Sequence, residues 1–116
     1  MSRATEYAFD EIKALPVFAD FSKSQVHSLL DRAEVCTHYH GESLFNAGEA
    51  ADFFGYVLSG VYKLVHYSID GEEVIMYFGG RGEALGIMSV MEMETKFPFN
   101  ALAMGTARFL KIPRDG

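Results

Sequence analysis

Cysteine is nearly absent from this chain of 116 residues, since Cys36 is the only one. One cysteine can form no internal disulfide, and it cannot supply the several thiolates that hold an iron–sulfur cluster. No apolar run approaches the ~18 residues needed to cross a bilayer. The N-terminal residues Met1–Tyr7 lack the basic and apolar regions of a secretory signal. These absences predict a cytoplasmic protein rather than a secreted or membrane protein.

Basic residues are also scarce. Lysine and arginine together number 10 against 16 aspartates and glutamates, which gives a formal net charge of −6. A domain that binds nucleic acid by its own surface usually carries a basic face, because neutralising phosphates supplies most of the non-specific affinity. We therefore expect that this chain does not bind DNA by itself. Its length is that of a single domain.

Two helices are predicted at the N-terminal end. Apolar residues at helical spacing precede Pro16, which would end the first helix. Ser22 and Gln25 form a capping-box pattern, in which each side chain accepts a hydrogen bond from the other residue's backbone N–H. An apolar stripe follows the box, so a second helix is predicted over Ser22–Ala33. Residues 1–33 would then be a helical lead-in.

From Glu34 onward the apolar period changes from helical to alternating, which predicts a β-rich region over residues 34–113. Turn signals at Ser59-Gly60 and Asp70-Gly71 separate the runs, and the second predicts a hairpin with a type I′ turn. Many short strands favour a jelly roll, that is, a double-stranded β-helix. Leu85–Glu94 is predicted as a loop with a short helix. The predicted strands are Val35–His40, Ser43–Phe45, Phe53–Leu58, Val61–Ser68, Glu73–Phe78, Phe99–Met104 and Ala107–Ile112.

Several motifs, in order along nearly the whole chain, resemble the N-terminal cyclic-nucleotide-binding-like sensor domain of the CRP/FNR family of transcription regulators. This resemblance implies a β-roll that senses a small-molecule effector allosterically. In full-length relatives the roll feeds a dimerisation helix and a helix-turn-helix DNA-binding domain. We expect the DNA-binding domain to be absent from this chain. Contacts with DNA would be made only through that domain. The resemblance also allows a homodimer. The motifs are Phe21–Leu30, Gly41–Glu49, Asp52–Gly60, Asp70–Glu73 and Lys111–Arg114.

Residues 81–101, which we call the cassette, resemble the phosphate-binding segment of that family. In relatives that bind nucleotide, a Gly-Glu pair contacts the ribose and an Arg-Ser or Arg-Thr pair contacts the cyclic phosphate. Here Gly86 is kept, but Ile87 takes the glutamate position and Phe97-Pro98 take the Arg-Ser positions. The resemblance places the effector pocket at eight cassette residues: Gly86, Ile87, Met88, Ser89, Phe97, Pro98, Phe99 and Asn100.

The chemistry of these replacements disfavours a cyclic nucleotide. A phosphate that leaves water usually needs a bidentate arginine, and a buried charge without its partner costs about 3–5 kcal/mol. That cost corresponds to roughly two to four orders of magnitude in affinity. Arg81 precedes the loop and is expected to point to solvent. We therefore expect an effector other than cAMP or cGMP.

The histidines raise one alternative function. Cys36, His38 and His40 alternate, so on a strand they would share one face and could bind a metal. A cupin-like metal-dependent enzyme or binder that uses His38 and His40 is therefore the alternative to a non-catalytic sensor. A solvated strand face is the simpler interpretation of this run. Haem would need an axial histidine, but His27 and His66 are expected on the surface, and no cofactor is expected.

Overall fold

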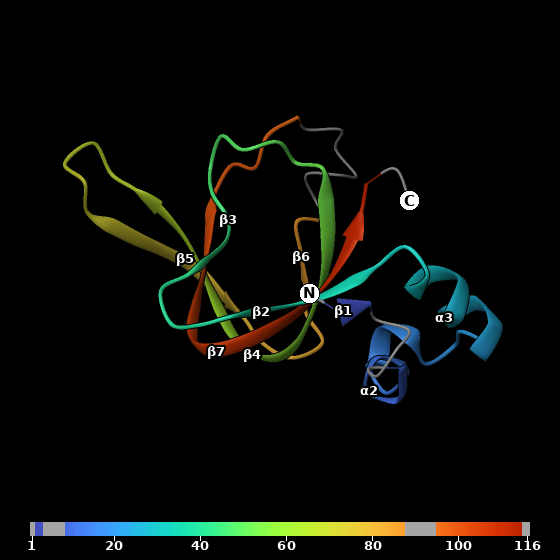
Figure 1. The fold of residues 1–116 in the computed structure, drawn as a ribbon. Helices are drawn as coiled ribbons and strands as arrows, with labels where there is room; N and C mark the ends of the chain where they lie inside the picture. The colour runs from blue at the N-terminus through green and yellow to red at the C-terminus, as the bar shows by residue number, and fades with distance from the viewer. Residues whose placement is uncertain (1, 4–8, 88–94, 115–116) are drawn as a thin grey trace.

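The computed structural model describes residues 2–3, 9–87 and 95–114. Short helices near the N-terminal end pack beside an antiparallel sheet that wraps into a roll (Figure 1). Along the chain the elements are β1 (Ser2–Arg3), α2 (Phe9–Lys13), the 3-10 helix η1 (Pro16–Phe18), α3 (Lys23–Leu30), β2 (Glu34–His38), β3 (Ser43–Phe45), β4 (Phe53–Tyr67), β5 (Glu73–Gly79), β6 (Ala84–Leu85) and β7 (Asn100–Pro113).

The capping box that the sequence predicts is present at the start of α3. Ser22 Oγ accepts a hydrogen bond from the backbone N–H of Gln25 at 3.1 Å, and Gln25 Oε1 accepts one from the N–H of Ser22 at 2.8 Å. The helix ends at Leu30, before the predicted end at Ala33. Since the box satisfies N–H groups that no helical carbonyl can reach, it fixes where α3 begins.

β4 and β7 are the two longest strands, and they form the frame of the roll. They pair with each other over two stretches, from Phe53 opposite Pro113 to Val57 opposite Phe109, and again from Val61 opposite Met104. The sheet order is β1-β2-β7-β4-β5, with β3 paired to β7 and β6 paired to β4. Because each of these long strands bends, it pairs with neighbouring strands on both sides of the wrapped sheet.

The sequence predicted that β4 and β7 would each be two strands, and this prediction is wrong. The pairing register shifts on either side of Ser59, and β4 continues through Gly60 to Tyr67. Gly60 has φ +77°, and a Cβ atom there would lie 2.5 Å from the carbonyl oxygen of Thr106. Glycine is required at this bend, so the turn signal marked a bend within the strand rather than its end.

The hairpin between β4 and β5 lies where the sequence predicts it, but its turn is not the predicted type I′. The N–H of Gly71 donates to the carbonyl of Ser68 at 2.9 Å, so Ile69 and Asp70 are the central residues of the turn. Gly71 follows them with φ +84°. This is the longer hairpin loop in which a turn precedes a left-handed glycine.

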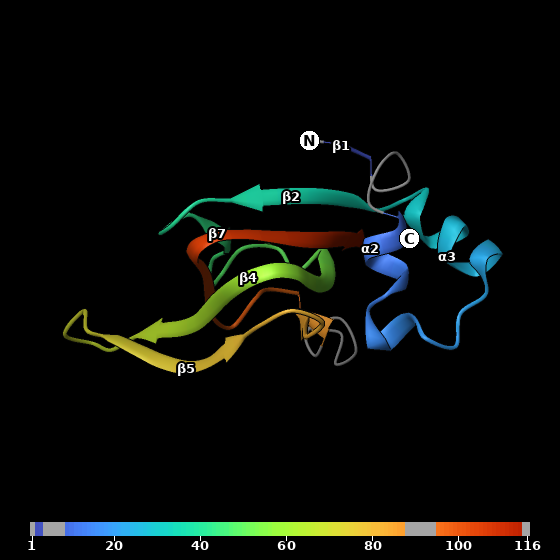
Figure 2. The same ribbon diagram turned by 90° about the horizontal axis from the view of Figure 1, so that it is seen from below.

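Two hydrophobic clusters stabilise the fold. In the first, residues of the helical segment, among them Ile12, Phe18 and Leu30, pack against the strands. The second fills the inside of the roll. The helices lie at one end of the molecule and the β4–β5 hairpin lies at the other end (Figure 2). This arrangement leaves the middle of the roll for the candidate site.

Candidate functional site

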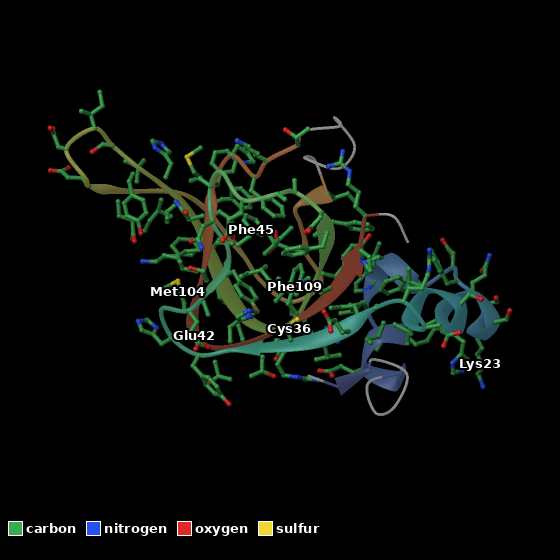
Figure 3. All side chains as sticks on the ribbon, turned by 45° about the horizontal axis from the view of Figure 1, so that its top comes forward. Lys23, Cys36, Glu42, Phe45, Met104 and Phe109 are labelled. Carbon is green, nitrogen blue, oxygen red and sulfur yellow. The ribbon has the colours of Figure 1, made fainter. Side chains whose placement is uncertain are left out.

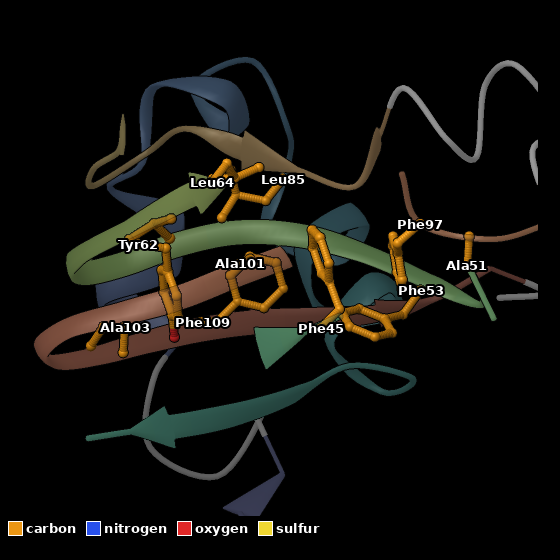
Figure 4. Packing of buried hydrophobic residues seen from close by; sticks show 12 residues of the cluster. Phe45, Ala51, Phe53, Tyr62, Leu64, Leu85, Phe97, Ala101, Ala103 and Phe109 are labelled. Atoms are coloured by element: carbon orange, nitrogen blue, oxygen red, sulfur yellow. The ribbon is translucent and has the colours of Figure 1, made fainter. Parts of the chain in front are cut away.

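Two phenylalanine rings, Phe45 and Phe97, line the candidate site, and a third, Phe53, packs against Phe97. Phe97 is only 2% exposed, and its ring stacks on Phe45 with 4.0 Å between ring centroids. Phe53 meets Phe97 edge to face at 5.3 Å. Figure 4 shows these three rings gathered inside the roll. The residue at the phosphate-clamp position of the cassette is therefore part of the hydrophobic core.

Beside these rings lies a cavity of about 220 Å³. Its described lining is apolar and aromatic, and it comes from β3, β4, β5, β6 and the cassette segment that precedes β7. The lining residues are Phe45, Leu64, Tyr77, Ala84, Gly86, Ile87, Phe97, Pro98 and Phe99. A largely apolar cavity with few polar groups is the usual form of a small-molecule site.

Five of the eight residues predicted for the effector pocket line this cavity: Gly86, Ile87, Phe97, Pro98 and Phe99. Their role in binding an effector stays a prediction. Met88 and Ser89 lie outside the described residues. Asn100 is not among the lining residues; its Oδ1 instead accepts a hydrogen bond from the N–H of Ala47 at 3.0 Å. Asn100 therefore has a structural contact with the segment after β3, and its predicted role in binding an effector is not tested by this contact.

Four lining residues were missed by the sequence analysis: Phe45, Leu64, Tyr77 and Ala84. The alternating pattern did indicate that Phe45 and Leu64 would face one side of their strands. It could not indicate that these strands meet the cassette, because that contact depends on how the sheet wraps. Ala84 lies in β6, a strand that the sequence did not predict.

Gly86 brings the cassette backbone close to the aromatic rings. Its φ is +83°, and a Cβ atom would lie 3.3 Å from the carbonyl oxygen of Phe53 and 3.4 Å from Cε1 of Phe97. A larger residue would meet the phenylalanine ring and would also be strained in its backbone. The glycine that the cassette keeps therefore serves close packing at the cavity wall.

No charged side chain is present among the described lining residues. Arg81 is exposed, as the sequence predicted. Lys111 Nζ lies 4.5 Å from the ring centroid of Phe53, but Lys111 does not line the cavity. The cavity thus lacks a described cation that could neutralise a bound phosphate.

Tyr77 carries the polar side-chain group of the described lining. Burial raises the pKa of its hydroxyl, and the nearby carboxylate of Glu83 raises it further. The hydroxyl is therefore neutral at physiological pH and can donate or accept a hydrogen bond. Because Glu83 is negative, this side of the cavity also disfavours an anionic ligand.

The prediction that Cys36, His38 and His40 form a solvated strand face is wrong for Cys36 and His38, while His40 is exposed. Cys36 is buried, and Nδ1 of His38 lies 2.8 Å from the hydroxyl of Tyr62, which is fully buried. Figure 3 shows Cys36 on β2, with Phe109 inside the roll. Burial raises the pKa of the Cys36 thiol and lowers the pKa of His38. Cys36 and His38 face the interior because their strand covers the core on that side.

The three residues are not brought together as a metal site. His40 lies beyond the end of β2, and its Nδ1 accepts a hydrogen bond from the N–H of Gly105 at 2.9 Å. Within residues 2–3, 9–87 and 95–114, no group of three or more His, Cys, Asp or Glu side chains could hold a metal ion. His27 and His66 are exposed, as predicted. In the same ranges, no helix is long and apolar enough to span a membrane.

The wrapped sheet, the short helices before it and the glycine-containing cassette define a β-roll of the kind found in ligand-binding sensor domains. The chain belongs to the cyclic nucleotide-binding domain family, whose sequence profile matches residues 37–116. The β-roll that the sequence predicts is thereby confirmed. A comparison with curated protein sequences found no match.

Solved structures share this fold. The regulatory subunit of a cAMP-independent protein kinase A from Trypanosoma brucei is 18% identical with a TM-score of 0.82, and the match covers 97% of this chain and 40% of that one. A candidate cyclic nucleotide binding protein from Ruegeria pomeroyi is 26% identical with a TM-score of 0.79, covering 92% of this chain and 49% of that one. This chain therefore spans less than half the length of either protein.

The sensor domain of the transcriptional regulator DNR from Pseudomonas aeruginosa is also similar. It is 19% identical with a TM-score of 0.82, and the match covers 91% of this chain and 71% of that chain. The fold of this chain is thus shared by the sensor domains of transcription regulators and by regulatory subunits of kinases.

Proposed function

We propose that this chain is a non-catalytic, ligand-sensing regulatory domain of a CRP/FNR-like transcription regulator, and that its effector is not cAMP or cGMP. One observation carries the second half of the proposal. Phe97 stands where the family's phosphate clamp has arginine, and it is buried against Phe45 and Phe53. A phosphate placed there would lose its hydration and would meet aromatic rings in place of a cation.

Two similar proteins support an effector other than cAMP. The Trypanosoma brucei kinase subunit is described as cAMP-independent, and a triple mutant of it, in which one change introduces an arginine, is bound to cAMP. The subunit from Trypanosoma cruzi, also of a cAMP-independent kinase, is bound to guanosine, which carries no phosphate. These relatives indicate that the β-roll can serve in a regulator without responding to cAMP.

The proposed mechanism is a shift between two packings of the domain. An effector in the cavity would touch both the roll, through Leu64 and Tyr77, and the cassette, through Ile87 and Phe97. Effector binding would therefore favour the arrangement of the cassette that closes on it. In a full regulator this bias would be passed to a dimerisation helix and so to the DNA-binding domain.

The proposal also names the partners and the cellular location. DNA would be contacted only through a helix-turn-helix domain, and the regulator would act in the cytoplasm as a homodimer. Strand β5 supports self-association, because its apolar residues from Val74 to Phe78 are 39–49% exposed. Exposed apolar patches of this kind often mark interaction surfaces.

Native mass spectrometry of the chain, purified without added ligand, tests the proposal. It reports the bound mass and the oligomeric state together. A bound small molecule other than a cyclic nucleotide, or a complex formed only on adding such a molecule, is the expected result. Stoichiometric cAMP or cGMP carried through purification would overturn the proposal.

A further inference from the structure

The size of the cavity limits what it can hold. An apolar cavity of about 150 Å³ is known to bind benzene, and pockets for drug-sized ligands begin at roughly 300 Å³. The volume here, about 220 Å³, lies between these values. The cavity therefore suits one aromatic ring or two fused rings, and it is small for a nucleoside, which adds a ribose to its base.

The lining also selects the chemistry of the ligand. Four of the nine described lining residues are aromatic: Phe45, Tyr77, Phe97 and Phe99. Aromatic rings prefer offset-stacked or edge-to-face contacts with other rings, and such pairs stabilise a complex beyond the area that they bury. A flat aromatic ligand can make these contacts with several walls at once.

One polar group remains to orient the ligand. The Tyr77 side chain is 46% exposed, so Tyr77 lies at the rim of the cavity. Its hydroxyl is neutral at physiological pH, and burial, followed by the carboxylate of Glu83, raises its pKa further. A neutral ligand with one hydrogen-bonding group can pair with this hydroxyl, whereas a carboxylate or phosphate would be repelled by Glu83.

We propose that the cavity binds a small neutral aromatic compound, one ring or two fused rings in size, whose single hydrogen-bonding group is recognised by the Tyr77 hydroxyl. This inference rests on the proposed function, because it names the class of effector for the same site. It differs from the proposed function in excluding nucleosides as well as cyclic nucleotides.

Calorimetric titration of the full chain with indole as the probe tests the inference. Indole has two fused rings and one N–H donor. We expect a dissociation constant of roughly 1 mM or tighter. Indole-3-acetate, which adds a negative charge to the same rings, should bind at least about tenfold more weakly, because its carboxylate meets no cation in the described lining.

Two variants link binding to the cavity, and each has a matched control. Ala84→Leu places an isobutyl group in the cavity and should weaken indole binding at least about tenfold. Ala47→Leu makes the same change at an exposed residue outside the lining and should leave binding unchanged. Tyr77→Phe removes one hydrogen bond and should weaken binding about two- to tenfold. Tyr67→Phe, at an exposed tyrosine on β4, is its control.

Titrations of the wild-type chain with the different ligands test the inference even if a variant fails to fold. Adenosine and guanosine are included in that series. If either nucleoside binds tightly and indole does not, the inference is wrong while the proposed function stands. If cAMP binds tightly, both are wrong. Equal binding of indole and indole-3-acetate, or no effect of Ala84→Leu, would also overturn the inference.

Discussion

Replacing Phe97 by alanine should destabilise the whole domain, although the residue stands at a position that binds ligand in nucleotide-binding relatives. The side chain is 2% exposed and contacts the rings of Phe45 and Phe53. Truncating a buried phenylalanine to alanine costs about 3–5 kcal/mol. For a domain of this size that loss corresponds to a fall in Tm of about 12–20 °C.

Urea denaturation followed by circular dichroism measures this effect. Phe78→Ala is the control, since Phe78 is 49% exposed on β5 and should cost less than about 1 kcal/mol. If Phe97→Ala costs no more than Phe78→Ala, then Phe97 is not part of the core. In that case the reason for excluding a phosphate from the cavity would fail.

Three further predictions follow from the contacts and the backbone. Burial lowers the pKa of His38, so the unfolded chain binds the proton more readily than the folded protein does. Its contribution to the free energy of unfolding should be complete above a pH of about 6.5 and lost as the pH falls, as measured by urea denaturation at several pH values. Gly60→Ala should cost about 1–3 kcal/mol in the same assay, because the new Cβ would meet a carbonyl oxygen in a left-handed backbone. The triple variant Ile87→Glu, Phe97→Arg and Pro98→Ser restores the residue types that contact cAMP in nucleotide-binding relatives. We expect it to bind cAMP measurably by calorimetry, because the phenylalanine ring is removed and an arginine cation is added for the phosphate.

Each of these predictions has its own control. His38→Gln should lack the part of the pH dependence that His38 supplies, and an unchanged pH profile would show that His38 does not contribute. Gly105→Ala also has a positive φ but meets nothing within 4 Å, so it should cost less than Gly60→Ala. The single change Phe97→Arg should restore less cAMP binding than the triple change. A folded triple variant without binding would mean that the cavity itself has been remodelled.

Local patterns in the sequence predict much of this fold. The Ser22–Gln25 box fixes the start of α3 because both hydrogen bonds lie within four residues. The alternating apolar period predicts the strands because it, too, can be recognised from a few neighbouring residues. The bend at Gly60 was mistaken for a strand end, because only the partner strand shows that pairing continues on both sides of it.

The site was predictable only in part. The cassette positions follow from the family resemblance, and five of them line the cavity. Tyr77 and Ala84 join them through the wrapping of the sheet, which no local pattern encodes. The contact between His38 and Tyr62 is of the same kind, since it joins β2 to β4 across the interior. This is why the His38 face was predicted to be solvated.

Titration of the wild-type chain with cAMP in a calorimeter tests the central claim most directly. The claim is that a buried phenylalanine has replaced the phosphate clamp, and that the described cavity lining holds no cation. We predict no saturable binding at cAMP concentrations up to about 1 mM, because the phosphate would be buried without a partner. Saturable binding with a micromolar or tighter dissociation constant would contradict the claim.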